Sequence, residues 1–266
     1  MFIENALYFF PIWISVACAL LPPMVVIIGI RLFRRREITN RATLTTRGTL
    51  QALLSTAFVF SVTFSVNQLW SQNSKIYEAA TEVAQSGVDL VDAVDQVDPL
   101  AADALTTQFT LFLEAADRDS LDIALSGATA ATDILKDIRA ELSELPADSD
   151  QAKAIDTAYE SVHSARRAWI AALNAPGIPD VIWINIIVLG LVFAGVIAAS
   201  PPGNYPRYET EIVALAGIVI GFFQIPLYVL NSREYVQTLT RDIFRNSPTI
   251  TPRPWGSSPV QGASLR

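Results

Sequence analysis

Four long apolar runs divide the chain, at residues 7–30, 50–70, 181–200 and 212–230. They are 24, 21, 20 and 19 residues long. A helix of about 20 apolar residues crosses the hydrocarbon core of a bilayer. A single segment in lipid must pair its own backbone groups and is therefore helical. The pattern predicts four transmembrane helices.

Residues 71–180 have a different pattern, with apolar positions alternately three and four apart, which is typical of amphipathic helices. The first apolar stripe runs from Ile76 to Val97, and no Pro or Gly cluster separates it from the second apolar run. We therefore expect one long helix through both. Asp98 followed by Pro99 predicts the start of the next helix.

Three further helices are expected in this segment. The second helix of the segment should run from residue 99 to about 117. The third should span about 120–145 and end before Pro146, since proline ends a helix at the preceding residue. The fourth should begin near residue 148 or 149 and end at Pro176. Short breaks between such helices favour an antiparallel bundle.

The predicted fold is all-α: four transmembrane helices plus an extramembrane helical bundle inserted between the second and third spans. Residues 1–70 hold the first two spans and a basic connecting loop. Residues 71–180 form the acidic bundle, and residues 181–231 hold the third and fourth spans. Residues 232–266 are expected to be a largely disordered tail, because the last 20 are rich in Pro, Ser and Thr.

The distribution of charged residues supports this division into apolar spans and an acidic bundle, and it excludes one class of protein. Only 17% of the 266 residues are charged, against 51% hydrophobic. Residues 71–180 carry 20 acidic and 7 basic side chains, while the rest carries 6 acidic and 12 basic. This excludes a soluble basic nucleic-acid-binding protein. The Lys and Arg residues close to the predicted spans are divided almost equally between the two sides of the membrane. The cluster at residues 31–36 slightly favours an acidic domain outside the cytoplasm.

The sequence contains no recognisable catalytic or metal-binding motif. It has one cysteine, Cys18, and one histidine, His163. Phosphate-binding glycine loops, nucleophile elbows and paired metal ligands are all missing from the sequence. We therefore expect no catalytic residues, no metal site and no cofactor, and we do not expect an enzyme.

The second apolar run carries polar and aromatic side chains on one helical face. At about 100° per residue, Thr56, Phe60, Phe64 and Asn67 lie on the same side. Ordinary hydrogen bonding between helices is the simpler explanation. The alternative is a pore lining, in which Phe60 and Phe64 form constrictions that gate by dewetting.

Small residues recur every fourth position in the last two apolar runs. Such spacing lets helices approach closely, within one chain or between chains. The candidate helix-packing residues are Gly190, Ala194 and Ala198 in the third run and Gly217 and Gly221 in the fourth.

An ordered set of segments resembles the bestrophin-like family of bacterial four-span membrane proteins over roughly residues 5–245. After the first span, residues 31–37 read RLFRRRE, and the second span includes FVFSVTF at 58–64. WSQN at 70–73 and EAA at 78–80 follow, and IPDVIW at 178–183 opens the third span. Where the family usually has a Leu-Asp-Arg-Pro-Phe-like motif, residues 230–234 read LNSRE.

The family is distantly similar to the bestrophins, which are pentameric anion channels with an aromatic neck on the second span. The resemblance implies neck positions at Phe60 and Phe64, with Thr56 one turn earlier. It also implies a homo-oligomer in the lipid bilayer of a bacterial plasma membrane, conducting chloride or another small ion, with a cytoplasmic helical domain. The alternative is a non-conducting, membrane-anchored protein that binds a partner or senses the envelope through its acidic domain.

Overall fold

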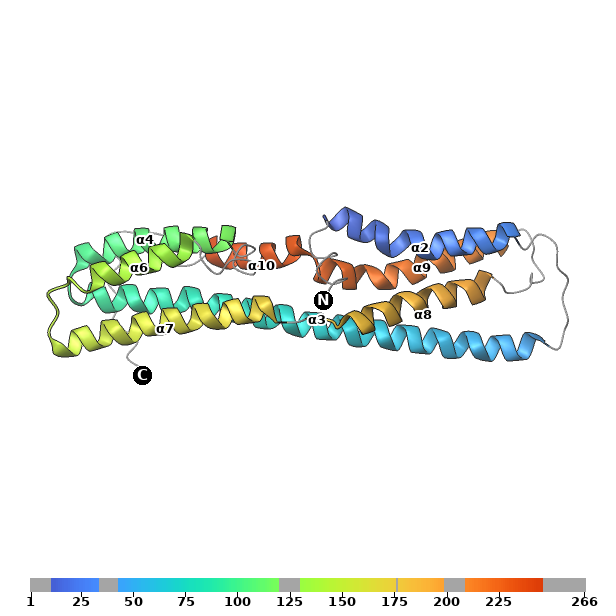
Figure 1. The fold of residues 1–266 in the computed structure, drawn as a ribbon, viewed down its shortest axis with the longest axis horizontal. Helices are drawn as coiled ribbons and strands as arrows, with labels where there is room; N and C mark the ends of the chain where they lie inside the picture. The colour runs from blue at the N-terminus through green and yellow to red at the C-terminus, as the bar shows by residue number, and fades with distance from the viewer. Residues whose placement is uncertain (1–10, 34–42, 120–129, 176, 199–208, 246–266) are drawn as a thin grey trace, which may run out of the picture. The chain divides into compact units, whose positions relative to one another are not determined.

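A computed structural model describes residues 11–33, 43–119, 130–175, 177–198 and 209–245. These residues form eight α-helices and, within those ranges, no strand. In chain order the helices are α2 (Ile12–Phe33), α3 (Thr43–Asp95), α4 (Pro99–Asp119), α6 (Ala130–Leu142), α7 (Ser149–Asn174), α8 (Asp180–Ala198), α9 (Glu209–Leu230) and α10 (Arg233–Arg245), drawn in Figure 1.

The helices belong to two compact units. We call residues 1–74 and 175–238 the apolar unit, and residues 75–174 and 239–266 the acidic unit. Helix α3 contributes its first part to the apolar unit and its last part to the acidic unit, and α10 is divided in the same way.

Three helices are long and apolar enough to cross a membrane, among the residues that the structure describes. They are α2, α3 and α8. A fourth span results if α9 and α10, which are bent by 46° at the break between them, are counted as one. The all-helical class predicted from the sequence is confirmed, and the length and composition of these helices identify a membrane protein.

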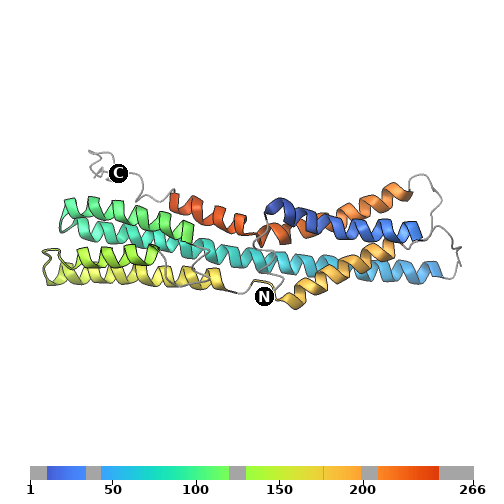
Figure 2. The same cartoon turned by 45° about the horizontal axis from the view of Figure 1, so that its top comes forward.

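The apolar unit packs α2 along α9, and both helices also contact α8; both views of the ribbon show α2 beside α9 (Figures 1 and 2). Its core joins the apolar part of α3 to α8 and α9. Trp183 of α8 and Tyr228 of α9 lie with ring centroids 5.3 Å apart. In lipid such helices associate through close packing and hydrogen bonds between them.

The acidic unit is held together by the apolar stripes that the sequence predicted. On α3, Ile76, Ala80, Val83, Leu90 and Val94 are all buried. The prediction of one helix that continues from the second apolar run into this stripe is confirmed by α3, which is 53 residues long.

Polar caps begin two helices of the acidic unit where the sequence placed them. Asp98 Oδ1 accepts a hydrogen bond from the Leu100 amide at 2.9 Å, with Pro99 as the first helical residue of α4. Before α7, Asp148 Oδ1 accepts from the Gln151 amide at 2.9 Å. The Gln151 side chain accepts from the Asp148 amide at 3.1 Å, which completes a capping box.

Two segments differ in the structure from what the sequence predicted, one in its length and one in its secondary structure. The third bundle helix is described only as α6, from residue 130. Part of the segment expected to be a tail, residues 233–245, forms α10. Ser232 caps α10, since its Oγ accepts a hydrogen bond from the Tyr235 amide at 3.3 Å. Three sequence-based expectations lie outside the described residues: the basic cluster at 34–36, the helix start expected at 120–129 and the tail from residue 246.

Candidate functional site

The candidate site is residues 48–74, the part of α3 that belongs to the apolar unit and whose side chains the structure describes. None of these residues is charged, and the helix is apolar enough here to cross a membrane. The polar side chains are Ser, Thr, Asn and Gln, which form hydrogen bonds without carrying charge.

One face of this segment packs into the core of the apolar unit. Phe58, Val62 and Leu69 are each at most 3% exposed. The Phe58 ring lies 6.1 Å from that of Phe193 on α8, centroid to centroid. Ser65 is buried on the same face. This face fixes which side of α3 is turned toward the other helices.

Three amide side chains anchor the C-terminal end of the segment through hydrogen bonds to backbone carbonyls. Gln68 Nε2 donates to the Gly177 carbonyl at 2.9 Å, and Gln72 Nε2 donates to the Ala175 carbonyl at 2.7 Å. Asn73 Nδ2 donates to the Leu230 carbonyl at 3.0 Å. The last bond pairs a carbonyl in the final turn of α9, where helices lack internal partners. Together these bonds resist rotation and sliding of α3.

The opposite face carries the four residues singled out in the sequence. Phe60 is 71% exposed and Phe64 is 55% exposed, and Thr56 and Asn67 are exposed as well. The Thr56 hydroxyl donates to the Ala52 carbonyl of its own helix at 2.9 Å. At about 100° per residue, this face is centred roughly opposite Phe58 and its buried neighbours.

We call the exposed set Thr56, Phe60, Phe64 and Asn67 the outer face of α3. Within the described residues these four side chains are exposed, and the hydrogen bond of the Thr56 hydroxyl stays within α3. The outer face offers two aromatic rings, a hydroxyl and a carboxamide. Such a surface can contact lipid, a second copy of the chain or a narrow column of water, and it contains no strong nucleophile or ionisable group.

The small residues of the last two spans lie against neighbouring helices of the same chain. A methyl group added at Gly221 would lie 3.0 Å from the Leu20 Cα and 3.1 Å from the Ala19 carbonyl of α2. One added at Gly217 would lie 2.6 Å from the Ile27 side chain. Backbone atoms of α2 face Gly221, whereas the atoms that face Gly217 belong to the flexible side chains of Ile27 and Met24. The close approach of α9 to α2 therefore depends most on the glycine at position 221.

On α8, Gly190 lies against the side chain of Gln224, a residue that was not among the sequence-based candidates. A methyl group there would be 2.6 Å from Gln224 Nε2 of α9 and 3.1 Å from the Phe58 ring. Ala194 and Ala198 are buried on the same face of α8. Gln224 is only 4% exposed. A glutamine inside an apolar run was the signal available, because polar residues within spans face the protein interior.

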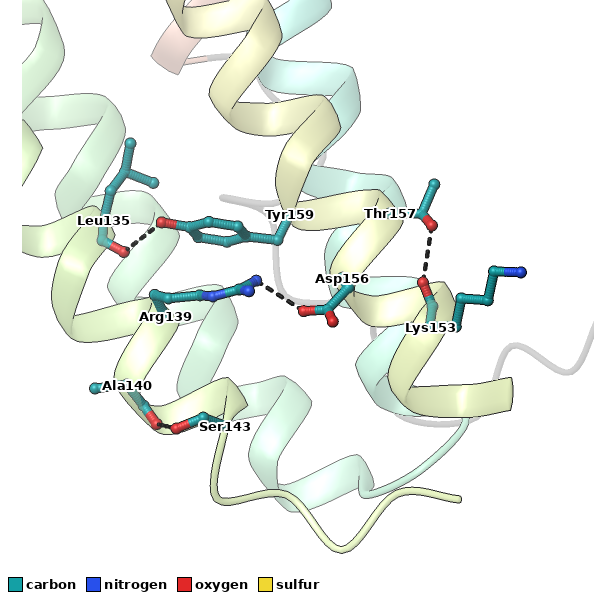
Figure 3. Close-up of polar contacts among 8 residues, drawn as sticks. All are labelled: Leu135, Arg139, Ala140, Ser143, Lys153, Asp156, Thr157 and Tyr159. Atoms are coloured by element: carbon teal, nitrogen blue, oxygen red, sulfur yellow. Dashed lines mark hydrogen bonds and ion pairs between the residues drawn. The ribbon is translucent and has the colours of Figure 1, made fainter. Parts of the chain in front are cut away.

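The acidic unit has its own polar contacts, at the corner where α6 meets α7 (Figure 3). The Tyr159 hydroxyl donates to the Leu135 carbonyl at 3.1 Å. The Arg139 guanidinium lies 4.8 Å from the centre of the Tyr159 ring and pairs with Asp156 at 2.8 Å. Burial raises the pKa of Tyr159, and the positive charge of Arg139 opposes that rise. These contacts join two helices.

Among the described residues, no group of three or more His, Cys, Asp or Glu side chains is arranged to hold a metal ion. Comparison with protein-family models gives a match described as a Bestrophin-like domain, which covers residues 17–232. A search of curated protein sequences found no match to the chain.

Proposed function

The chain belongs to the bestrophin-like family, and on this premise we propose that it is a homo-oligomeric ion channel. The protein is helical, with helices apolar enough to cross a membrane. In the proposal it crosses a bacterial plasma membrane four times, with the acidic bundle inserted between the second and third spans. The conducted species is a small ion such as chloride, as in the bestrophin channels that the family resembles.

The observation that carries this proposal is the outer face of α3. Phe60 and Phe64 remain exposed although α3 is packed and hydrogen-bonded on its other side. Copies arranged around an axis would bring these rings together while leaving the contacts of Phe58 and Gln72 intact. A ring of phenyl groups makes a narrow hydrophobic constriction, and such constrictions gate ion flow by excluding water.

The neighbouring polar side chains suit the same role. Thr56 and Asn67 lie on either side of the two phenylalanines along the outer face. A hydroxyl and a carboxamide can replace part of an ion's hydration shell on entry to the constriction. Helix-packing contacts at Gly190, Gly217 and Gly221 hold the supporting helices behind α3.

Ion flux through liposomes that contain the purified chain tests the proposal. Replacing both rings, Phe60→Ala with Phe64→Ala, should raise flux because the constriction is widened. The matched control is Phe222→Ala with Phe223→Ala, which removes two exposed phenylalanines from α9. Flux should be measured separately with chloride and potassium gradients, so that the conducted ion is identified.

An increase confined to the α3 variant supports a channel with its constriction at these rings. No flux in either variant or in the parent protein, with folding and insertion verified, would contradict channel activity. Equal increases in both variants would indicate a general leak and would also contradict a neck on α3.

The second candidate function is a non-conducting, membrane-anchored protein that binds a partner through the acidic bundle. It is favoured by a surface pocket of about 600 Å3 between α3 and α7. Asp89, Asp150 and Lys153 line the pocket together with small side chains, and Ser86 hydrogen-bonds Ser161 nearby at 3.3 Å. Lack of flux together with saturable capture of a partner that Asp89→Asn weakens would support this function.

A further inference from the structure

A pocket of about 460 Å3 lies on the acidic unit where the end of α4 faces α10. Cavities of roughly 300–1,000 Å3 accommodate small molecules. Its walls bring together residues from the last two turns of α4 and the end of α10, with arginine as the commonest residue type. They are Leu113, Glu114, Asp117, Arg118, Arg241, Phe244 and Arg245.

Two contacts hold α10 at this pocket. Phe244 is buried, and its ring meets that of Trp169 edge-on with centroids 5.4 Å apart. Arg241 Nε donates to Asp117 Oδ2 at 3.3 Å. Arg241 and Arg245 are one helical turn apart and thus lie on the same side of α10. Docking of Phe244 therefore also brings Arg245 to the pocket.

The charge of the pocket is opposite to that of its surroundings. Residues 71–180 carry 20 acidic and 7 basic side chains, yet three arginines and only two carboxylates line this pocket. Arg241 and Asp117 neutralise each other. That leaves Arg118 and Arg245 facing a single carboxylate, Glu114, so the pocket has a net positive charge.

The two remaining guanidinium groups retain most of their hydrogen-bonding capacity. Arg118 donates from Nε to the Glu114 carbonyl at 3.3 Å. This contact uses one of the five N–H donors of the group. Within the described residues, Arg118 and Arg245 take part in no ion pair. The ring contact of Phe244 and the ion pair of Arg241 involve neither of these two arginines.

We propose that this pocket binds a phosphate group, held between Arg118 and Arg245. Guanidinium groups bind phosphate oxygens in pairs through short, charge-assisted hydrogen bonds. The volume exceeds that of a single inorganic ion, and Leu113 and Phe244 supply an apolar wall for the remainder of the ligand. The phosphate belongs to a lipid headgroup or to a soluble phosphorylated molecule. The site does not depend on channel activity.

Pyrophosphate binding to the full-length protein in detergent tests the soluble form of the ligand. The variant Arg118→Ala with Arg245→Ala leaves the Arg241–Asp117 and Phe244–Trp169 contacts in place and should weaken binding at least about tenfold, since each hydrogen bond to a charged group contributes substantially. The control Lys136→Ala with Arg167→Ala removes two exposed positive charges elsewhere on the acidic unit and should leave binding unchanged.

A second experiment, with lipids, distinguishes a lipid headgroup from a soluble molecule as the source of the phosphate. The protein is placed in nanodiscs of phosphatidylcholine with or without phosphatidylglycerol, and retained lipid is measured by native mass spectrometry. Selective retention of phosphatidylglycerol that disappears in the Arg118, Arg245 variant and persists in the control supports a headgroup. Loss of pyrophosphate binding in that variant alone supports a soluble ligand.

A single substitution tests the proposal even if the double variant fails to fold. Arg245→Gln alters only the last residue of α10 and should weaken whichever ligand binds, with an unchanged unfolding temperature. If neither pyrophosphate nor phosphatidylglycerol binding depends on Arg118 or Arg245, the proposal is wrong. Equal losses in the variant and the control would indicate general charge attraction and would overturn it as well.

Discussion

At the scale of single residues, Gly87 shows how closely the acidic bundle is packed. A methyl group at this position would overlap the ring of Phe109 on α4, which is itself fully buried. Gly87→Ala should therefore lower stability by about 1–3 kcal/mol, as overpacking does in other cores. Gly48→Ala is the control, because no neighbouring atom lies within 4 Å there. Thermal unfolding should show a lower midpoint for the first variant only; equal midpoints would contradict this packing.

Tyr159 gives the acidic unit a dependence on alkaline pH. Burial raises its pKa above the ordinary value of 10.0, so the folded state favours the protonated hydroxyl that donates to Leu135. Its contribution is complete below pH 10 and is lost as pH rises through the higher folded-state pKa. Tyr159→Phe should cost about 1 kcal/mol at neutral pH. The gap between parent and variant should close on alkaline titration, and a gap that widens would contradict the account.

At the scale of elements, the orientation of α3 depends on its amide anchors. Asn73→Ala removes the buried hydrogen bond to the Leu230 carbonyl and leaves that carbonyl unpaired. We expect a loss of about 1–3 kcal/mol, measured by thermal unfolding in detergent. Ser71→Ala, an exposed change on the same helix, should have little effect. Similar midpoints for the two variants would show that Asn73 does not anchor α3.

Much of this architecture was predictable at the element scale, for identifiable reasons. The continuity of α3 followed from the lack of Pro or Gly clusters before Val97, and α4 followed from Asp98 and Pro99. Helix α10 was missed because composition dominated the interpretation of the tail. Its signal was present in Val236, Thr240 and Phe244, spaced four apart and buried in the structure.

The candidate site was predictable only in part. Helical periodicity placed Thr56, Phe60, Phe64 and Asn67 on one face, but it could not show whether that face is covered. Coverage depends on where the partners of Phe58 and Gln72 lie, and these are more than 100 residues away in the sequence. The contact between Gln224 and Gly190 likewise could not be predicted, because it depends on the packing of α8 against α9.

At the scale of the whole molecule, the chain combines an apolar unit of membrane-type helices with an acidic unit of amphipathic ones. Membership of the bestrophin-like family is the reason why we propose that the exposed face of α3 lines a pore. If copies assemble around that face, ions must pass Phe60, Phe64 and Asn67 in turn. A lipid-facing role for α3 would place the same residues away from any ion path.

Chemical modification at residue 67 is the sharpest test of whether ions pass along α3. In a Cys18→Ala background, Asn67→Cys protein in liposomes would be treated with a charged, thiol-specific methanethiosulfonate reagent during flux. The control is Phe222→Cys, on an exposed position of α9. If ions pass along α3, modification changes flux sharply at residue 67 and leaves it unchanged at residue 222. Complete modification of residue 67 with no change in flux would show that ions do not pass along α3.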